Sequence, residues 1–218
     1  MKKAVDSGVF GPIVYLPSHS RLGKPSSGNL KRQAVFLDRD GTIIDDVGYL
    51  VNISNVKFLK GVEENIRLLQ EKFLIIIITN QSAVARGLIE EDDLLHIHES
   101  LVYHLRARGV IIDAIYSCPH HPELGIPPYN IQCNCRKPKP GLIEKAVHDF
   151  NIELKQSYII GDKLTDIEAG QRAKVHKTIL LNSPELKFNT IQEIKPSFVV
   201  TSFKQAISII LALQYSEA

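Results

Sequence analysis

The run FLIIIIT at residues 73–79 constrains the fold more than any other part of the chain, because it contains four consecutive isoleucines. Side chains alternate between the two faces of a strand, so an unbroken apolar run predicts a strand buried on both faces. Such strands belong mostly to parallel sheets whose two faces are covered by helices. The six apolar residues are far too few to span a bilayer. The run therefore predicts a central strand of an α/β domain.

The remaining pattern alternates strands with helices and indicates a doubly wound, Rossmann-like parallel sheet over residues 33–218. The composition, 44% hydrophobic and 23% charged, is typical of a soluble globular domain. Strands are predicted at residues 34–37, 73–79, 110–117, 157–161, 177–181 and 198–200. Helices are predicted at residues 61–71, from about 90 to 105, at 141–150, from about 165 to 173, and from 202 to about 213.

Residues 1–32 are rich in Gly, Pro and Ser and show neither the helical nor the strand period. We interpret them as an irregular N-terminal arm that precedes the domain. An alternative is that VFGPIVYL, residues 9–16, packs on the core or forms an edge strand.

The charge pattern argues against nucleic acid or a membrane surface as a partner. There are 26 basic and 24 acidic residues, for a net charge of +2, and no basic block. Lys2 and Lys3 are not followed by the continuous apolar segment of a secretory signal. We therefore expect a cytoplasmic protein, and we expect it to be a monomer.

Polar residues cluster where the predicted strands end, and ligands bind beyond the carboxyl ends of strands in such sheets. Carboxylates from two strand ends form the oxygen-rich site that Mg²⁺ prefers. A lysine and a threonine beside them favour a phosphate group as the substrate, and an aspartate can attack phosphorus as a nucleophile. The residues are Asp38 and Asp40, Thr79 and Asn80, Asp162, and the loop pair Arg136 and Lys137.

Four motifs in order, DRDGT, TNQS, RKPKPG and GDKLTD, resemble those of the haloacid dehalogenase superfamily of phosphatases. The resemblance covers residues 33 to about 182. It implies that Asp38 is the nucleophile and that Asp40 is the general acid and then the general base. It also implies Mg²⁺ held by the carboxylates of Asp38 and Asp162, the backbone carbonyl of Asp40 and a backbone oxygen of Lys163.

The same resemblance implies the groups that bind the substrate. Thr79 and Lys137 would stabilise the transferring phosphoryl group, and Arg136 would recognise the rest of the substrate. The side chain of Lys163 would also face the substrate. The remaining pocket residues would be Asp46, Val47, Gly48, Tyr49, Asn80, Gln81 and Ser82. At Ala83 the chain departs from the glycine that is usual in the family.

Longer matches, DRDGTIIDDVGY, TNQSAVARG, CPHHP and CNCRKPKPG, resemble the branch that dephosphorylates a heptose bisphosphate on the route to nucleotide-activated heptose. Phosphatases of histidinol phosphate share this layout and are the alternative. The DDVGY segment and Arg136 favour the bisphosphate, because a second phosphate requires a further cation. The sequence does not decide between the α and β anomers. A binding module with an inactive site is disfavoured because the aspartate pair and Lys137 are intact.

All three cysteines lie in one loop, in a C-x-H … C-x-C arrangement that suits a closed, structural Zn²⁺ site. The ligands would be Cys118, His120, Cys133 and Cys135. The adjacent His121 could replace His120 geometrically, although the family resemblance favours His120. The alternative is three free thiols. Zinc would hold the loop that carries Arg136 and Lys137.

The segments between the motifs are too short for a separate cap domain over the site, so we expect an open pocket. By strand alternation, Arg39 is expected to point away from Asp40 and to serve packing or a surface ion pair. Asp166 is expected to support the metal ligands or to cap a helix.

Several other polar residues receive no functional role. His96, His98 and His104 are expected at solvent-facing or partly buried helix positions, and Asp45 in solvent. Arg86 either reaches the pocket or lies on the surface.

Overall fold

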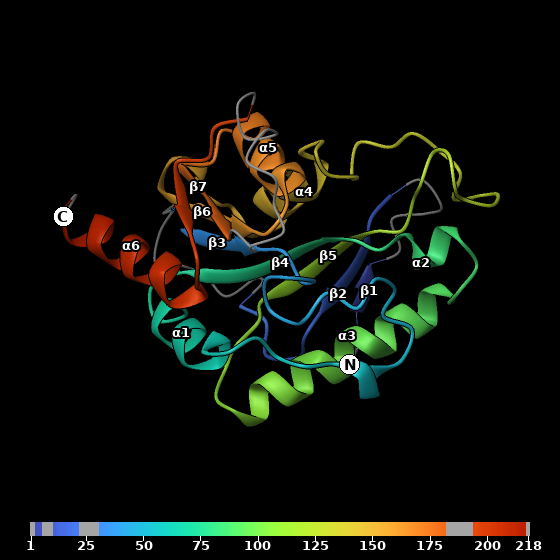
Figure 1. Ribbon diagram of the computed structural model, residues 1–218, viewed down its shortest axis with the longest axis horizontal. Helices are drawn as coiled ribbons and strands as arrows, with labels where there is room; N and C mark the ends of the chain where they lie inside the picture. Colours follow the sequence, from blue (N-terminus) through green and yellow to red (C-terminus); the bar gives the residue numbers. More distant parts are fainter. Residues whose placement is uncertain (1–2, 6–10, 22–30, 182–193, 217–218) are drawn as a thin grey trace.

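The computed structural model describes residues 3–5, 11–21, 31–181 and 194–216, and its centre is a twisted sheet with helices on both faces (Figure 1). Eight strands of the described residues form one sheet in the order β1-β2-β5-β4-β3-β6-β7-β8. The six strands from β5 to β8 in this order run parallel, which confirms the predicted fold class. The strands are β1 (Lys3–Val5), β2 (Ile13–Leu16), β3 (Ala34–Leu37), β4 (Leu74–Asn80), β5 (Ala114–Cys118), β6 (Tyr158–Gly161), β7 (Lys177–Leu181) and β8 (Phe198–Val200).

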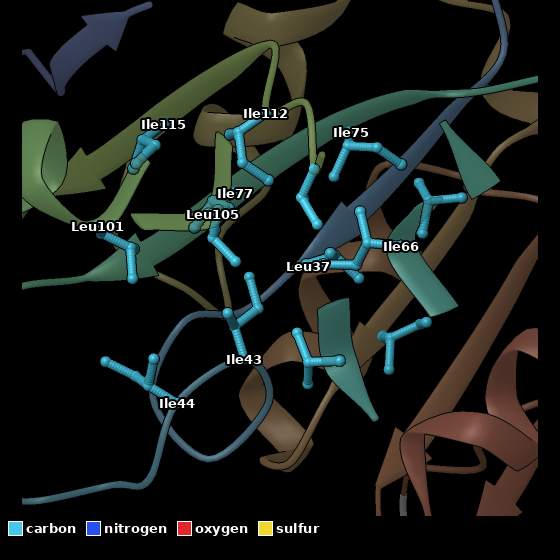
Figure 2. Packing of buried hydrophobic residues seen from close by; sticks show 14 of the residues in the cluster. Leu37, Ile43, Ile44, Ile66, Ile75, Ile77, Leu101, Leu105, Ile112 and Ile115 are labelled. Atoms are coloured by element: carbon cyan, nitrogen blue, oxygen red, sulfur yellow. The ribbon is translucent and has the colours of Figure 1, made fainter. Parts of the chain in front are cut away.

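The isoleucine run forms β4, which lies between β3 and β5. Its side chains alternate between two cores, as a strand covered on both faces requires. Ile75 and Ile77 join one core, in which Figure 2 shows them near Leu37 of β3. Ile76 and Ile78 join the core on the opposite face.

The helices divide between these two cores. Helices α1, α3 and α6 cover one face of the sheet, and α4 and α5 cover the other (Figure 1). The short α2 follows β4 directly. The helices are α1 (Val62–Leu69), α2 (Ser82–Ala85), α3 (Glu91–Ala107), α4 (Gly141–Phe150), α5 (Leu164–Arg172) and α6 (Phe203–Ser216), with two 3-10 turns, η1 (Ile53–Asn55) and η2 (Leu154–Gln156). None of these helices combines the length and apolar character that a membrane span needs.

The expectation of an irregular N-terminal arm is wrong for two of its segments. Strand β2 pairs antiparallel with β5 and continues the sheet, and β1 pairs with β2. Val14 of β2 is buried, which explains the apolar residues of IVYL. As in the alternative, VFGPIVYL supplies a strand of the sheet, but β2 lies between β1 and β5 and β1 is at the edge. Residues 9–10, the start of this segment, lie outside the described residues.

Strand β5 begins at Ala114 and not at Val110 as predicted. The residues before it are held by a buried carboxylate. Asp113 accepts a hydrogen bond from the backbone of Ile75 at 2.8 Å and ion pairs with Arg21 at 2.6 Å. Within the described residues, only η1 and α1 separate β3 from β4, and only α2 and α3 separate β4 from β5, so the sheet carries no separate cap domain there.

Candidate active site and metal cluster

The nucleophile candidate Asp38 directly follows β3 and is only 5% exposed. Its backbone N–H donates to the carbonyl of Ile160 on β6, which holds it between two strand ends. The chain then turns sharply, because the carbonyl of Arg39 accepts hydrogen bonds from the N–H groups of Ile43 and Ile44. Gly41 makes this turn possible at a φ of 78°.

Lys137 is buried in the site and bridges two carboxylates. Its Nζ donates to Asp38 Oδ1 at 2.8 Å and to the carbonyl of Ile78 at 2.8 Å, and it lies 2.6 Å from Asp166 Oδ1. Burial alone would lower the pKa of Lys137, but the charges of Asp166 and Asp38 raise it above its usual value. These two carboxylates therefore favour the charged form of Lys137 next to the nucleophile candidate.

The side chain of Asn80 is hydrogen-bonded to the backbone of Lys137. Asn80 Nδ2 donates to the backbone carbonyl of Lys137 at 3.1 Å, and the backbone N–H of Lys137 donates to Asn80 Oδ1 at 3.0 Å. These reciprocal bonds attach the loop that carries Lys137 to the end of β4. The side chain of Asn80, predicted to line the pocket, thus positions the lysine.

Three carboxylates, those of Asp38, Asp162 and Asp166, have oxygen atoms within 4.8 Å of one another. Asp162 Oδ1 is buried and has no hydrogen-bond partner among the described residues. Burial, together with the charges of Asp38 and Asp166, raises the pKa of Asp162 to about 7. A buried carboxylate with these neighbours is costly to ionise without a cation. The arrangement therefore fits a divalent cation with oxygen ligands.

Asp166 is the least available ligand of the three. Its Oδ1 pairs with Lys137, and its Oδ2 accepts the N–H of Lys163 at 3.0 Å at the start of α5. The contact with Lys163 is the predicted helix-capping one, and support of the metal ligands stays a prediction. Burial and the charge of Asp38 raise the pKa of Asp166 to about 6, although Lys137 opposes this.

The prediction for Arg39 is wrong in direction and in location. Its side chain is 1% exposed and lies against Asp40, with Nη2 3.0 Å from both carboxylate oxygens. The chain leaves the strand geometry at Leu37, so alternation no longer applies at Arg39. Gln81, predicted to line the pocket, instead donates to Asp40 Oδ2 at 2.8 Å and to Thr79 Oγ1 at 2.7 Å. These contacts of Arg39 and Gln81 were missed, although an arginine between two aspartates at a strand end was the available signal.

Residues 45–49 form an exposed flap beside the cluster. Asp46 Oδ2 accepts from Lys163 Nζ at 2.8 Å, which ties the flap to the start of α5. On the other side the guanidinium of Arg86 lies 5.0 Å from the ring centre of Tyr49. Arg86 therefore reaches the flap. Val47 and Tyr49 are more than two-fifths exposed, and Ser82 at the start of α2 is half-buried.

The cysteine loop brings four potential ligands together. The side chains of Cys118, His120, Cys133 and Cys135 have donor atoms within 4.8 Å of one another. The three sulfur atoms are separated by 3.2–3.5 Å, close to the edge of about 3.7 Å expected for a tetrahedral Zn²⁺ with thiolate ligands. Hydrogen bonds with Cys118 and Cys135 lower the pKa of the Cys133 thiol. The donor set fits a structural zinc ion.

His120 and not His121 lies in this cluster. Its Nδ1 is 3.4 Å from Cys135 Sγ, whereas Nδ1 of His121 accepts the N–H of Leu124 at 3.1 Å. The carbonyl of His120 accepts a hydrogen bond from Arg136 Nη1 at 3.0 Å. The loop therefore determines where Arg136 lies.

The prediction for His98 is wrong. It is fully buried, with Nε2 2.7 Å from Ser117 Oγ, and burial followed by the charge of Arg39 holds its pKa well below the usual value. His96, His104 and Asp45 are exposed, as expected. Ala83 is buried in the core beside α3, so its methyl group is accommodated.

The comparisons with known proteins identify the family. The profile of the HAD-hydrolase-like family matches residues 134–206. D-glycero-beta-D-manno-heptose-1,7-bisphosphate 7-phosphatase of Yersinia pestis is 40% identical over 151 residues, which are 69% of this chain and 80% of the relative. The chain belongs to this phosphatase family of the haloacid dehalogenase superfamily. It is therefore a phosphoric monoester hydrolase.

The family contains enzymes named for either anomer. D-glycero-alpha-D-manno-heptose-1,7-bisphosphate 7-phosphatase of Burkholderia mallei is 40% identical over 153 residues, 70% of this chain and 81% of the relative. Among solved structures, D,D-heptose 1,7-bisphosphate phosphatase of B. bronchiseptica, complexed with magnesium and phosphate, has a TM-score of 0.72. It is 27% identical, and the match covers 83% of this chain and 98% of that structure.

Proposed function

We propose that the protein removes the 7-phosphate of D-glycero-D-manno-heptose 1,7-bisphosphate in a Mg²⁺-dependent reaction, as a step of nucleotide-activated heptose biosynthesis. The observation that carries the proposal is the buried Lys137, which joins Asp38 to Asp166 beside the orphaned oxygen of Asp162. This arrangement supports a nucleophile, a cation and a group of metal-binding carboxylates at one point. The names of the relatives support the heptose substrate.

The carboxylates of Asp38 and Asp162 and the backbone oxygens of Asp40 and Lys163 would hold the ion, which when bound offsets negative charge around the phosphoryl group. In the first step an Asp38 oxygen forms a bond to phosphorus. The bond between phosphorus and the sugar oxygen breaks, and that oxygen takes a proton from Asp40. Lys137 and Thr79 stabilise the charge on the phosphoryl oxygens.

In the second step water attacks the phosphorus of the aspartyl phosphate. Asp40 accepts a proton from this water, and the bond between phosphorus and Asp38 breaks. The sum of both steps is one ester and one water converted to one alcohol and one phosphate, with both side chains restored.

The rest of the substrate would face cationic groups. Arg136, Lys139 and Arg172 border a cavity of about 350 Å³ that also reaches Lys137. Arg136 is held there by the carbonyl of His120. A fixed guanidinium suits a second phosphate, because its donors match phosphate oxygens in pairs. This supports a bisphosphate over a substrate with one phosphate.

The experiment is phosphate release with Mg²⁺ from the α and β anomers of the heptose bisphosphate and from histidinol phosphate, with Asp38→Asn as the blank. A strong preference for one heptose anomer would support the proposal and identify the pathway. A preference for histidinol phosphate would contradict the substrate while keeping the mechanism. Release by Asp38→Asn at the wild-type rate would contradict the mechanism.

A further inference from the structure

A buried arginine contacts the proposed acid-base residue, and the mechanism above does not use it. Arg39 Nε donates to Asp40 Oδ1 at 3.1 Å, and Nη2 reaches Oδ1 and Oδ2 at 3.0 Å. A guanidinium with 1% exposure is costly to hold unless its charge is paired. The pairing therefore determines where the carboxyl group of Asp40 lies.

Gln81 closes this contact into a ring. Its Oε1 accepts from Arg39 Nη2 at 2.8 Å, and its Nε2 donates to Asp40 Oδ2 at 2.8 Å. The same Nε2 donates to Thr79 Oγ1 at 2.7 Å, which attaches the ring to the end of β4. Each member of the ring thus restricts the rotamers of the other two, and the amide of Gln81 leaves Asp40 little freedom to turn.

We propose that Arg39 and Gln81 are positioning residues, which hold the Asp40 carboxyl group where it exchanges a proton with the leaving oxygen and then with water. The inference rests on the proposed acid-base role of Asp40 and not on the identity of the sugar. A positioned general acid or base contributes on the order of 10²- to 10⁴-fold in rate. Displacement of a reacting group by about 1 Å can cost on the order of 10²-fold.

The test compares two leaving groups in the full chain with Mg²⁺. Phenyl phosphate releases a phenoxide that benefits from a proton, whereas 2,4-dinitrophenyl phosphate releases a stable anion that does not. The variants are Arg39→Gln, which removes the charge and the paired donors, and Gln81→Met, which removes the amide hydrogen bonds at similar side-chain volume. For phenyl phosphate we expect kcat/KM to fall about 10- to 100-fold. For dinitrophenyl phosphate we expect a fall of less than about threefold.

A second readout separates the two chemical steps. Hydrolysis of the aspartyl phosphate still needs Asp40 as a base, so rapid mixing of either variant with dinitrophenyl phosphate should give a burst of dinitrophenol. Arg39→Lys keeps the charge but loses the planar fork, and its phenyl phosphate rate should lie between wild type and Arg39→Gln. Arg21→Gln removes a distant arginine that is also paired with a carboxylate, and it is the matched control. It should not change the ratio of the kcat/KM values for the two substrates.

The outcomes separate this inference from the proposed function. Suppose that Asp40→Asn lowers kcat/KM for phenyl phosphate selectively, whereas Arg39→Gln and Gln81→Met lower kcat/KM equally for both substrates. The positioning role is then overturned. If Asp40→Asn lowers kcat/KM equally for both substrates, the acid-base role of Asp40 itself is contradicted. Thermal unfolding verifies that the variants fold. If Arg39→Gln does not fold, the Gln81→Met variant alone decides between the outcomes.

Discussion

At Gly41 the backbone closely approaches the carboxylate cluster of Asp38, Asp162 and Asp166. A Cβ atom built at this position would lie 2.3 Å from Asp162 Oδ2, and the φ of 78° disfavours any side chain. Gly41→Ala must therefore displace the Asp162 carboxylate. We expect the Mg²⁺ concentration for half-maximal phosphate release to rise by about 10- to 100-fold, as when a metal ligand loses its support.

Gly109→Ala is the matched control for this prediction. Gly109 has a nearly equal φ of 77°, but its added Cβ would make only an ordinary contact of 3.4 Å with Arg67. Both variants should lose about 1 kcal/mol of unfolding free energy from the left-handed backbone. Only Gly41→Ala should change the Mg²⁺ dependence, measured by titrating the ion in a phosphate-release assay. Equal dependence in both variants would argue against Asp162 as a ligand.

Side-chain direction was the part of the site that the sequence predicted least well. Asp38, Lys137 and Asp162 could be placed together because Asp38 and Asp162 each follow a predicted strand and Lys137 lies in the loop before a predicted helix. Arg39 could not be placed, since its direction depends on the turn that starts after Leu37. The burial of His98 likewise depends on Ser117 of β5, a partner 19 residues away that the period of α3 does not reveal.

The loop with the cysteines carries the four proposed zinc ligands. Arg136 is tied to this loop through the carbonyl of His120, whereas Lys137 is tied to β4 through Asn80. Loss of zinc should therefore weaken substrate binding more than the chemical step. For His120→Ala we expect KM to rise about 10-fold and kcat to change less than about threefold.

Zinc content by elemental analysis and steady-state kinetics test this prediction. His121→Ala is the control, because His121 binds loop amides and lies outside the four-residue cluster. It should retain about one zinc ion per chain and a nearly normal KM. Full zinc content in His120→Ala would contradict the ligand set, and a fall in kcat with an unchanged KM would contradict the separate attachment of Arg136 and Lys137.

At the level of elements, the short apolar strands were predicted best. The bounds of β3, β7 and β8 agree with the sequence pattern, because apolar runs between polar turns leave little choice. The pairing of β2 with β5 was left as an alternative, since a four-residue strand carries no local sign of its partner. Strand β5 begins after Asp113, whose carboxylate binds Arg21 and the N–H of Ile75. These distant partners cannot be recognised in the pattern of residues 110–117.

Across the whole molecule, the N-terminal segment belongs to the domain and is held at two places. Strand β2 covers β5, and Arg21 binds the fully buried Asp113 and the carbonyls of Gln70 and Phe73. Without Arg21 the carboxylate of Asp113 is left buried without its cation. Arg21→Gln should therefore lower the free energy of unfolding by about 3 kcal/mol, at the lower end for a buried pair because Arg21 is one-quarter exposed.

Deletion of residues 1–32 should have a larger effect than Arg21→Gln, because it also uncovers the edge of β5. An exposed edge offers unpaired backbone groups to other chains, so we expect concentration-dependent association besides the lower stability. Urea unfolding and light scattering measure the two effects. Lys31→Gln, which removes a largely exposed pair with Glu153, is the control and should leave the urea midpoint unchanged. A deletion variant with the wild-type midpoint would instead show that the sheet from β5 to β8 is stable alone, and that the domain begins at residue 33.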